Sequence, residues 1–105
     1  MPMFQVHDVK EFSASKFVLK IPIQTSQARC RVYCLEPGQG IPLHQHDEAT
    51  DVFQIVEGIG QVTLQNEVHA AHPDTVILVH PGQPHGITNP GPGRLVFTSI
   101  FIPGR

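Results

Sequence analysis

The chain has 105 residues, seven of them basic and nine acidic, which gives a formal net charge of −2 with histidine neutral. A chain of this length forms one domain and buries roughly 60–70% of its unfolded surface. The nearly balanced charge, without a basic cluster, argues against a nucleic-acid partner. No apolar run approaches the roughly 18 residues that span a bilayer, and the N-terminal segment lacks the apolar core of a signal peptide. We therefore expect a soluble cytoplasmic protein without a membrane partner.

The predicted elements are short strands. Ten prolines and nine glycines divide the chain, and the segments between them are rich in Val, Ile, Phe and Thr, as strands are. The one helix that we expect is a turn within residues 8–16. The expected strands in chain order are residues 17–23, 29–35, 41–46, 52–57, 60–64, 75–80, 85–88 and 95–102. About eight strands separated by Gly- and Pro-containing turns are typical of an all-β jelly roll or barrel.

Both cysteines fall in the second expected strand. In an extended chain Cys30 and Cys34 lie about 13 Å apart, which is too far for a disulfide. We therefore expect two free thiols.

The same strand has a polar face, formed by Arg29, Arg31 and Tyr33, and an opposite face that carries the thiols. Burying an arginine without a partner is costly, so the alternation favours a polar face that points outward. If that face points inward, Arg31 and Tyr33 could hold an anionic or oxygenated substrate. Both stay candidates for lining a substrate pocket, together with Phe53 and Ile100.

The last expected strand, residues 95–102, is largely apolar on both faces. When both faces of a strand are apolar, both are expected to be covered. We therefore predict that a second copy of the chain packs over one sheet and that the protein is a homodimer.

Three histidines and one aspartate form a candidate metal site. His44 and His46 are two residues apart in an expected strand, and a strand sends residues i and i+2 to the same face. Asp51 begins the next apolar segment, and His85 begins a later strand. Imidazole and carboxylate ligands suit a divalent Fe, Mn, Ni, Cu or Zn ion and disfavour Ca and Mg. We expect one such ion as cofactor.

The spacing of these residues resembles the two motifs of the cupin family. The first motif reads glycine, five residues, His-x-His, three or four residues, Glu, six residues and glycine. Its counterparts here are Gly38, His44, His46, Asp51 and Gly58. The second motif is matched in its second half by Gly82, His85 and Asn89. Asp74 and His80 stand where that motif has glycine and proline.

Asp51 is one methylene shorter than the Glu of the family motif. Either the strand approaches the ion more closely and Asp51 binds directly, or Asp51 acts through a water molecule. Glu48 in the preceding loop is a competing donor. We expect Asp51 to be the direct ligand because of its spacing from Gly58.

The resemblance implies one cupin domain over residues 1–105, with a double-stranded β-helix, or jelly-roll barrel, at residues 28–102. Residues 1–27 then form an N-terminal strand or arm. The family includes many activities, so fold alone does not define the reaction. The leading hypothesis is a metal-dependent oxidoreductase of dioxygenase type that acts on a small oxygenated molecule, with His80 as candidate acid or base. A non-catalytic module that binds a small molecule or metal, and an isomerase or epimerase, are the alternatives.

The remaining motif residues have structural interpretations. The motif glycines supply backbone conformations that other residues resist, and Asn89 is expected to form a turn. The histidines outside the motifs are expected to be exposed; they are His7, His69 and His72.

Overall fold

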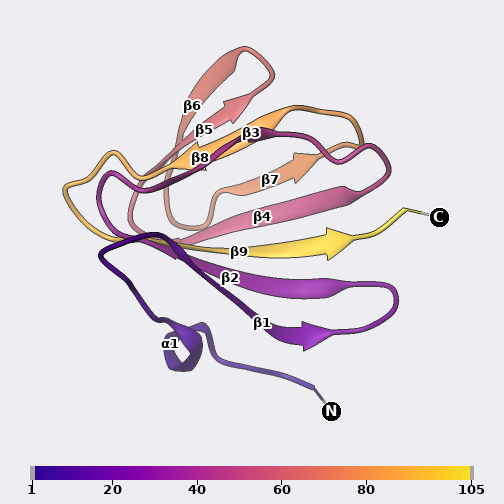
Figure 1. The fold of residues 1–105 in the computed structure, drawn as a ribbon, viewed down its shortest axis with the longest axis horizontal. Helices are drawn as coiled ribbons and strands as arrows, with labels where there is room; N and C mark the ends of the chain where they lie inside the picture. Colours follow the sequence, from indigo (N-terminus) through magenta and orange to yellow (C-terminus); the bar gives the residue numbers. More distant parts are fainter. Residues whose placement is uncertain (1, 105) are drawn as a thin grey trace.

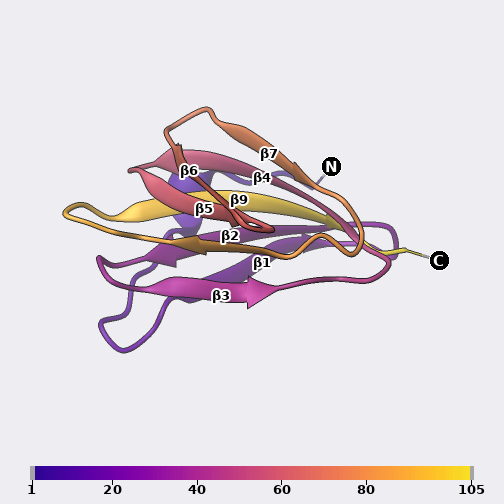
Figure 2. The ribbon, with the colours of Figure 1, turned by 90° about the horizontal axis from the view of Figure 1, so that it is seen from above.

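The computed structural model describes residues 2–104 as two antiparallel β-sheets that face each other (Figure 1). One sheet has the strand order β1-β2-β9-β4-β7, and the other has the order β3-β8-β5-β6. Seen from above, the long strands β2, β9 and β4 run side by side with turns at both ends of the molecule (Figure 2). The elements are α1 (Val6–Val9), β1 (Val18–Gln24), β2 (Arg29–Leu35), β3 (Gly40–His44), β4 (Thr50–Glu57), β5 (Gly60–Leu64), β6 (Glu67–Ala71), β7 (Val76–Val79), β8 (His85–Thr88) and β9 (Leu95–Ile102).

The predicted all-β architecture is confirmed, and β2, β5, β8 and β9 have the expected bounds. Strand β6 was not predicted, because its Glu, His and Ala residues have weak strand propensity. It forms because a turn with Gln65 at φ 56° folds it back onto β5. The helical turn lies at Val6–Val9, slightly earlier than the expected residues 8–16. Among residues 2–104, no helix has the length and apolar character needed to cross a membrane.

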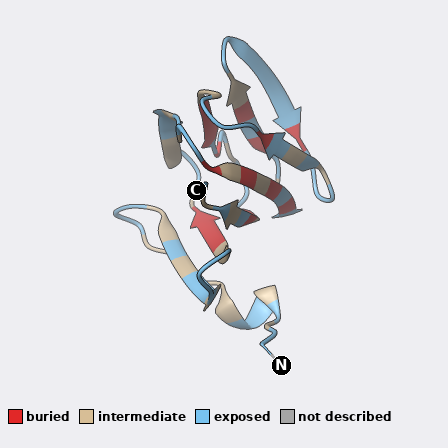
Figure 3. Cartoon of the chain, turned by 90° about the vertical axis from the view of Figure 1, so that its right-hand side faces the viewer, coloured by how far each residue is buried: buried red, intermediate tan, exposed pale blue. Residues whose placement is uncertain are grey.

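The main core fills the space between the two sheets. Inward-facing residues of both sheets meet there, and Phe97, Leu35, Ile55 and Leu95 are fully buried. Figure 3 shows the buried residues concentrated on the strands, whereas the N-terminal segment is only partly covered. Burial of these apolar side chains away from water supplies the main favourable contribution to the free energy of folding.

A second core lies on the outer face of the five-stranded sheet. Val32, Cys34 and Val96 are fully buried there, beneath apolar residues of the N-terminal segment. The covering residues are Phe4, Val6, Val9, Phe12 and Val18. The chain's own arm, rather than a second subunit, therefore covers this end of the outer face.

Both cysteines are free thiols, as predicted.

A buried asparagine ties the loop before β9 to the end of β2. The side-chain nitrogen of Asn89 donates hydrogen bonds to the carbonyl oxygens of Leu35 and Gly93, both at 2.9 Å. Its side-chain oxygen accepts a hydrogen bond from the backbone nitrogen of Gly91. Asn89 thus has the turn-forming role expected from the sequence.

The close contact between Gly58 and the backbone of Arg94 can be tested by substitution. Its φ is +83°, and a Cβ atom at this position would collide with the backbone carbonyl of Arg94. Gly38 has a similar φ of +89°, but a Cβ atom there would meet no other atom within 4 Å. Gly38→Ala should therefore lower the free energy of unfolding by about 1–2 kcal/mol, the left-handed backbone term alone. Gly58→Ala should lower it substantially more, as measured by urea denaturation. Equal losses for the two variants would contradict the predicted backbone contact.

Candidate metal centre

The pairing of β3 with β8 brings the first and last motif histidines together. His44 lies directly opposite His85 in this antiparallel register. His46 follows two residues after His44, just beyond the end of β3, and the backbone nitrogen of Gly82 donates a hydrogen bond to its carbonyl at 2.7 Å. One ligand atom from each of these histidines lies within 4.8 Å of the others. The structure therefore brings together all three histidines that the sequence selected.

Backbone carbonyls orient two of the rings. The Nδ1 atom of His44 lies 2.8 Å from the carbonyl oxygen of Pro42, and Nδ1 of His85 lies 2.9 Å from that of Gln83. A carbonyl oxygen only accepts, so Nδ1 carries the proton in both rings. The lone pair of each neutral ring is then on Nε2, which is the arrangement that a metal-binding imidazole needs.

The Nε2 atom of His85 gives the clearest indication that the cluster fits a cation. His85 is 2% exposed, and its Nε2 has no hydrogen-bond partner among the described residues. A buried polar atom without a partner is costly, and such atoms in native proteins usually have a reason. A cation among the three rings would satisfy it. Three imidazoles suit Zn, Cu, Fe and Ni better than the oxygen-preferring Mn, Mg and Ca, so the residues fit a transition-metal ion.

The surroundings favour neutral imidazoles. Burial lowers the pKa of His85, and the neighbouring His44 lowers it further, against the opposing effect of the hydrogen bond to Gln83. Burial and the other two histidines lower the pKa of His46. The ring of His46 packs edge-on against Phe101, with the centroids 5.1 Å apart. Neutral rings are the form that binds metal.

Asp51 does not join the three histidines. It is 1% exposed, and both of its carboxylate oxygens accept hydrogen bonds from other side chains. Arg31 Nη2 donates to Oδ2 at 2.9 Å, and Ser99 Oγ donates to Oδ1 at 2.5 Å. Burial raises the pKa of Asp51, while Ser99 and Arg31 oppose that shift. The expected fourth ligand is thus placed in an ion pair beside the histidines, because Arg31 and Ser99 hold both oxygens.

The polar face of β2 points inward, contrary to the orientation that the alternation favoured. Tyr33 belongs to the main core, where its ring stacks on Phe97 with centroids 4.8 Å apart. The Arg31 side chain is only 13% exposed. The outward expectation is wrong because it assumed that a buried arginine would lack a partner, and Asp51 provides one.

The other two pocket candidates lie on opposite faces. Phe53 is buried, and its ring centroid lies 5.8 Å from that of His85. Ile100 is 43% exposed. It alternates with the inward-facing Ser99 and Phe101, so it lies on the outer face of the sheet and cannot line an interior pocket.

The remaining candidates lie outside the histidine cluster. His80 is exposed in the turn before β8, where its backbone nitrogen donates to the side chain of Gln83 at 3.1 Å. Glu48 is also exposed. Neither belongs to the group that could hold an ion. The three histidines outside the motifs are exposed, as predicted.

Two neighbours of the site, Ser99 and Phe101, were not selected from the sequence. Both project inward from β9, where Ser99 contacts Asp51 and Phe101 contacts His46. Period-two alternation with the core residue Phe97 identifies their shared face. It does not reveal that this face adjoins the histidines, because that depends on the strand order.

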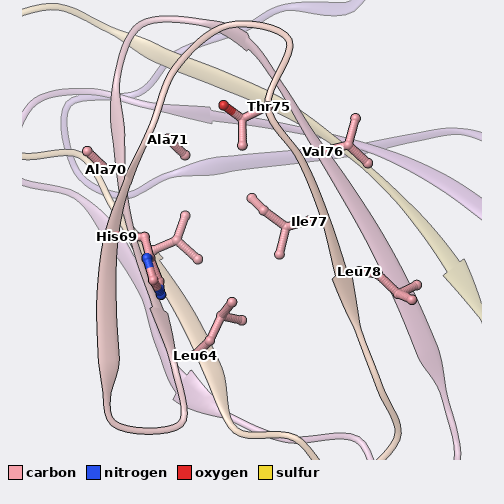
Figure 4. Close-up of a pocket in the computed structure, with 9 residues that line it drawn as sticks. Leu64, His69, Ala70, Ala71, Thr75, Val76, Ile77 and Leu78 are labelled. Carbon is pink, nitrogen blue, oxygen red and sulfur yellow. The ribbon is translucent and has the colours of Figure 1, made fainter.

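A cavity of about 430 Å³ is lined by none of the three histidines. It opens between the edge strands β6 and β7, and its lining is mostly apolar (Figure 4). Leu64 and Ile77 reach it from the inner faces of the two sheets. Leu64, which lines the cavity, pairs with His85 across β5 and β8, so the cavity adjoins the histidine cluster.

Comparison with known proteins identifies the family. The cupin domain family matches residues 31–101, which is well over half of the chain. The chain therefore belongs to the cupin family, as its motifs indicated. No curated protein matches it significantly.

Solved structures confirm the double-stranded β-helix. The protein TT1209 from Thermus thermophilus is 21% identical, with a TM-score of 0.94 and 98% of each chain covered. An uncharacterized conserved protein with a double-stranded β-helix domain from Klebsiella pneumoniae is 25% identical, with a TM-score of 0.91, 100% of this chain and 92% of that chain covered. A predicted oxalate decarboxylase from Thermotoga maritima is 22% identical, with a TM-score of 0.79, covering 83% of this chain and 80% of that chain.

The lowered histidine pKa values predict how stability depends on pH without metal. Both His46 and His85 take up protons in the folded state below their ordinary pKa of 6.5. The unfolded chain then binds more protons at mildly acidic pH, so the free energy of unfolding should fall as the pH drops from about 7 through 6.5 to 5. Urea denaturation of metal-free protein measures this change. His85→Gln should flatten the dependence, and equal slopes for wild type and His85→Gln would contradict the prediction.

Proposed function

We propose that this cupin is a metal-dependent oxidoreductase of dioxygenase type, acting on a small oxygenated organic molecule. The observation that carries the proposal is the convergence of His44, His46 and His85, together with the Nε2 atom of buried His85, which is unpartnered among the described residues. Three protein ligands leave further coordination positions for exchangeable ligands, as catalytic metal sites require.

The residues around the histidines support a catalytic use of the site. When bound, a transition-metal ion supplies Lewis-acid and redox chemistry. The backbone carbonyls of Pro42 and Gln83 orient the rings of His44 and His85. Aromatic rings of Phe53 and Phe101 border the cluster. The Thermotoga maritima neighbour, a predicted oxalate decarboxylase, suggests small carboxylic acids as a substrate class to include.

Metal analysis tests the site itself. Protein purified without an affinity tag should contain about one transition-metal ion per chain. His44→Ala and His85→Ala should lose most of that metal, because each removes one of three ligands. His72→Ala, which removes an exposed histidine outside the cluster, should retain it. Wild-type protein without metal even after incubation with Fe(II), Co(II), Ni(II) and Zn(II) would contradict the proposal.

Oxygen uptake tests the reaction. The iron-loaded protein should consume dioxygen with at least one member of a panel of catechols, flavonols, thiols and small carboxylic acids. Uptake should be lost in His85→Ala and kept in His72→Ala. A metal-bound protein that is silent across the panel would favour the non-catalytic binding module instead.

We also propose that the protein forms a homodimer through the uncovered part of its outer sheet face. The strand register aligns Cys30, Ile100, Val52 and Leu78 in one row across β2, β9, β4 and β7. Ile100 and Leu78 are 43% and 50% exposed. The described part of the N-terminal arm leaves them uncovered, and burying such a row against a second copy is favourable.

Charge placed in this row should dissociate the dimer. The double variant Ile100→Lys/Leu78→Lys is expected to sediment as a monomer at concentrations where wild type is dimeric, because each lysine would lose hydration in the interface. Val68→Lys changes an exposed apolar residue on the other sheet and should stay dimeric. A monomeric wild type at about 100 µM would refute the dimer.

A further inference from the structure

Arg31 and Asp51 form a buried ion pair on the inner face of the barrel. The Arg31 side chain is 13% exposed and the Asp51 side chain 2% exposed, and the two are joined at 2.9 Å. Ser99 faces Arg31 across β2 and β9, and its hydroxyl holds the second oxygen of Asp51. Hydrogen bonds from Arg31 and Ser99 thus hold the Asp51 carboxylate in place, and Asp51 in turn orients the guanidinium.

The guanidinium of Arg31 has hydrogen-bond donors that Asp51 does not use. An arginine has five N–H donors, and the hydrogen bond to Asp51 comes from Nη2. The Nε atom of Arg31 is buried without any partner among the described residues. Two buried nitrogens of this kind, Arg31 Nε and His85 Nε2, therefore occur in the same part of the barrel.

Aromatic contacts place Arg31 next to the histidines. Its guanidinium carbon lies 4.5 Å from the ring centroid of Phe101, and that ring meets His46 at 5.1 Å. The ring of Phe101 therefore lies between the positively charged guanidinium and His46. Phe101 thus links the guanidinium to the histidine cluster on the inner face of the barrel.

The charge balance of the site favours an anion. Asp51 is neutralised by Arg31 and is not grouped with the histidines. A divalent ion held by neutral imidazoles would keep its full double charge beside the buried His85 and the half-buried His44 and His46. An anionic ligand compensates that charge, and the planar fork of an arginine matches a carboxylate in particular.

We propose that Arg31 binds the carboxylate of the substrate, that Asp51 and Ser99 position Arg31 and do not bind metal, and that the substrates are small carboxylic acids. This inference rests on the proposed function, since it concerns the same metal centre. It assigns Asp51 a role different from the one that its motif position predicts.

Binding of glycolate to the cobalt-loaded full-length protein tests the proposal. Glycolamide is the neutral probe of nearly equal size, and the visible absorption of Co(II) together with calorimetry reports both metal and probe binding. Arg31→Gln should weaken glycolate binding about ten- to a hundredfold, since one charge-assisted hydrogen bond is lost. It should leave glycolamide binding and cobalt affinity within about threefold of wild type. Arg94→Gln, which breaks the exposed pair with Glu36, is the matched control and should bind glycolate like wild type.

Asp51→Asn separates a positioning residue from a ligand. If Asp51 positions Arg31, this variant should keep its cobalt affinity and visible spectrum while glycolate binding weakens. If Asp51 is a ligand, cobalt affinity should fall about as far as in His85→Ala, and the proposal is overturned. Unchanged glycolate binding in Arg31→Gln would also overturn it.

Two further variants protect the test against misfolding. Arg31→Gln/Asp51→Asn removes both charges, so no uncompensated charge stays buried. Arg31→Lys keeps the charge but lacks the planar fork, and it should weaken glycolate binding as well. Wild-type protein that binds no cobalt would refute the metal centre itself, whereas normal cobalt binding with unchanged glycolate affinity in these variants would refute only the role of Arg31.

Discussion

The candidate metal centre depends on one constraint, the antiparallel register between β3 and β8. This register places His44 opposite His85, and His46 follows two residues later, just beyond the end of β3. A slip of one residue would send every side chain of β8 to the other face. Gly86 supports the register, because a Cβ atom there would lie 3.0 Å from the carbonyl oxygen of Ile41. The close approach of β3 and β8 therefore depends on Gly86, the residue that follows His85.

Electrostatics divides the barrel interior into two polar units. One consists of the three imidazoles, of which His46 and His85 have lowered pKa values because burial disfavours their charged forms. The other is the pair of Arg31 and Asp51 with Ser99, whose charges compensate each other. A buried pair is tolerated only when its geometry and hydrogen bonds are good. In this chain the carboxylate of the first motif pairs with an arginine, and the three imidazoles form the group that could hold an ion.

Much of this could be predicted from local patterns. The period-two spacing of His44 and His46 and the motif position of His85 identified the cluster, since both signals are local in sequence. The environment of Asp51 could not be predicted, because Arg31 lies twenty residues away and meets it only through the strand order β2-β9-β4. Similarly, apolar residues on both faces of β9 indicated that both are covered. They did not reveal that the N-terminal arm covers part of the outer face.

Anomalous diffraction from crystals of the cobalt-loaded protein tests the central claim most directly. The account predicts one anomalous peak among His44, His46 and His85, with the carboxylate of Asp51 still bound to Arg31 and Ser99. A peak coordinated by Asp51, or no peak among the three imidazoles, would contradict it.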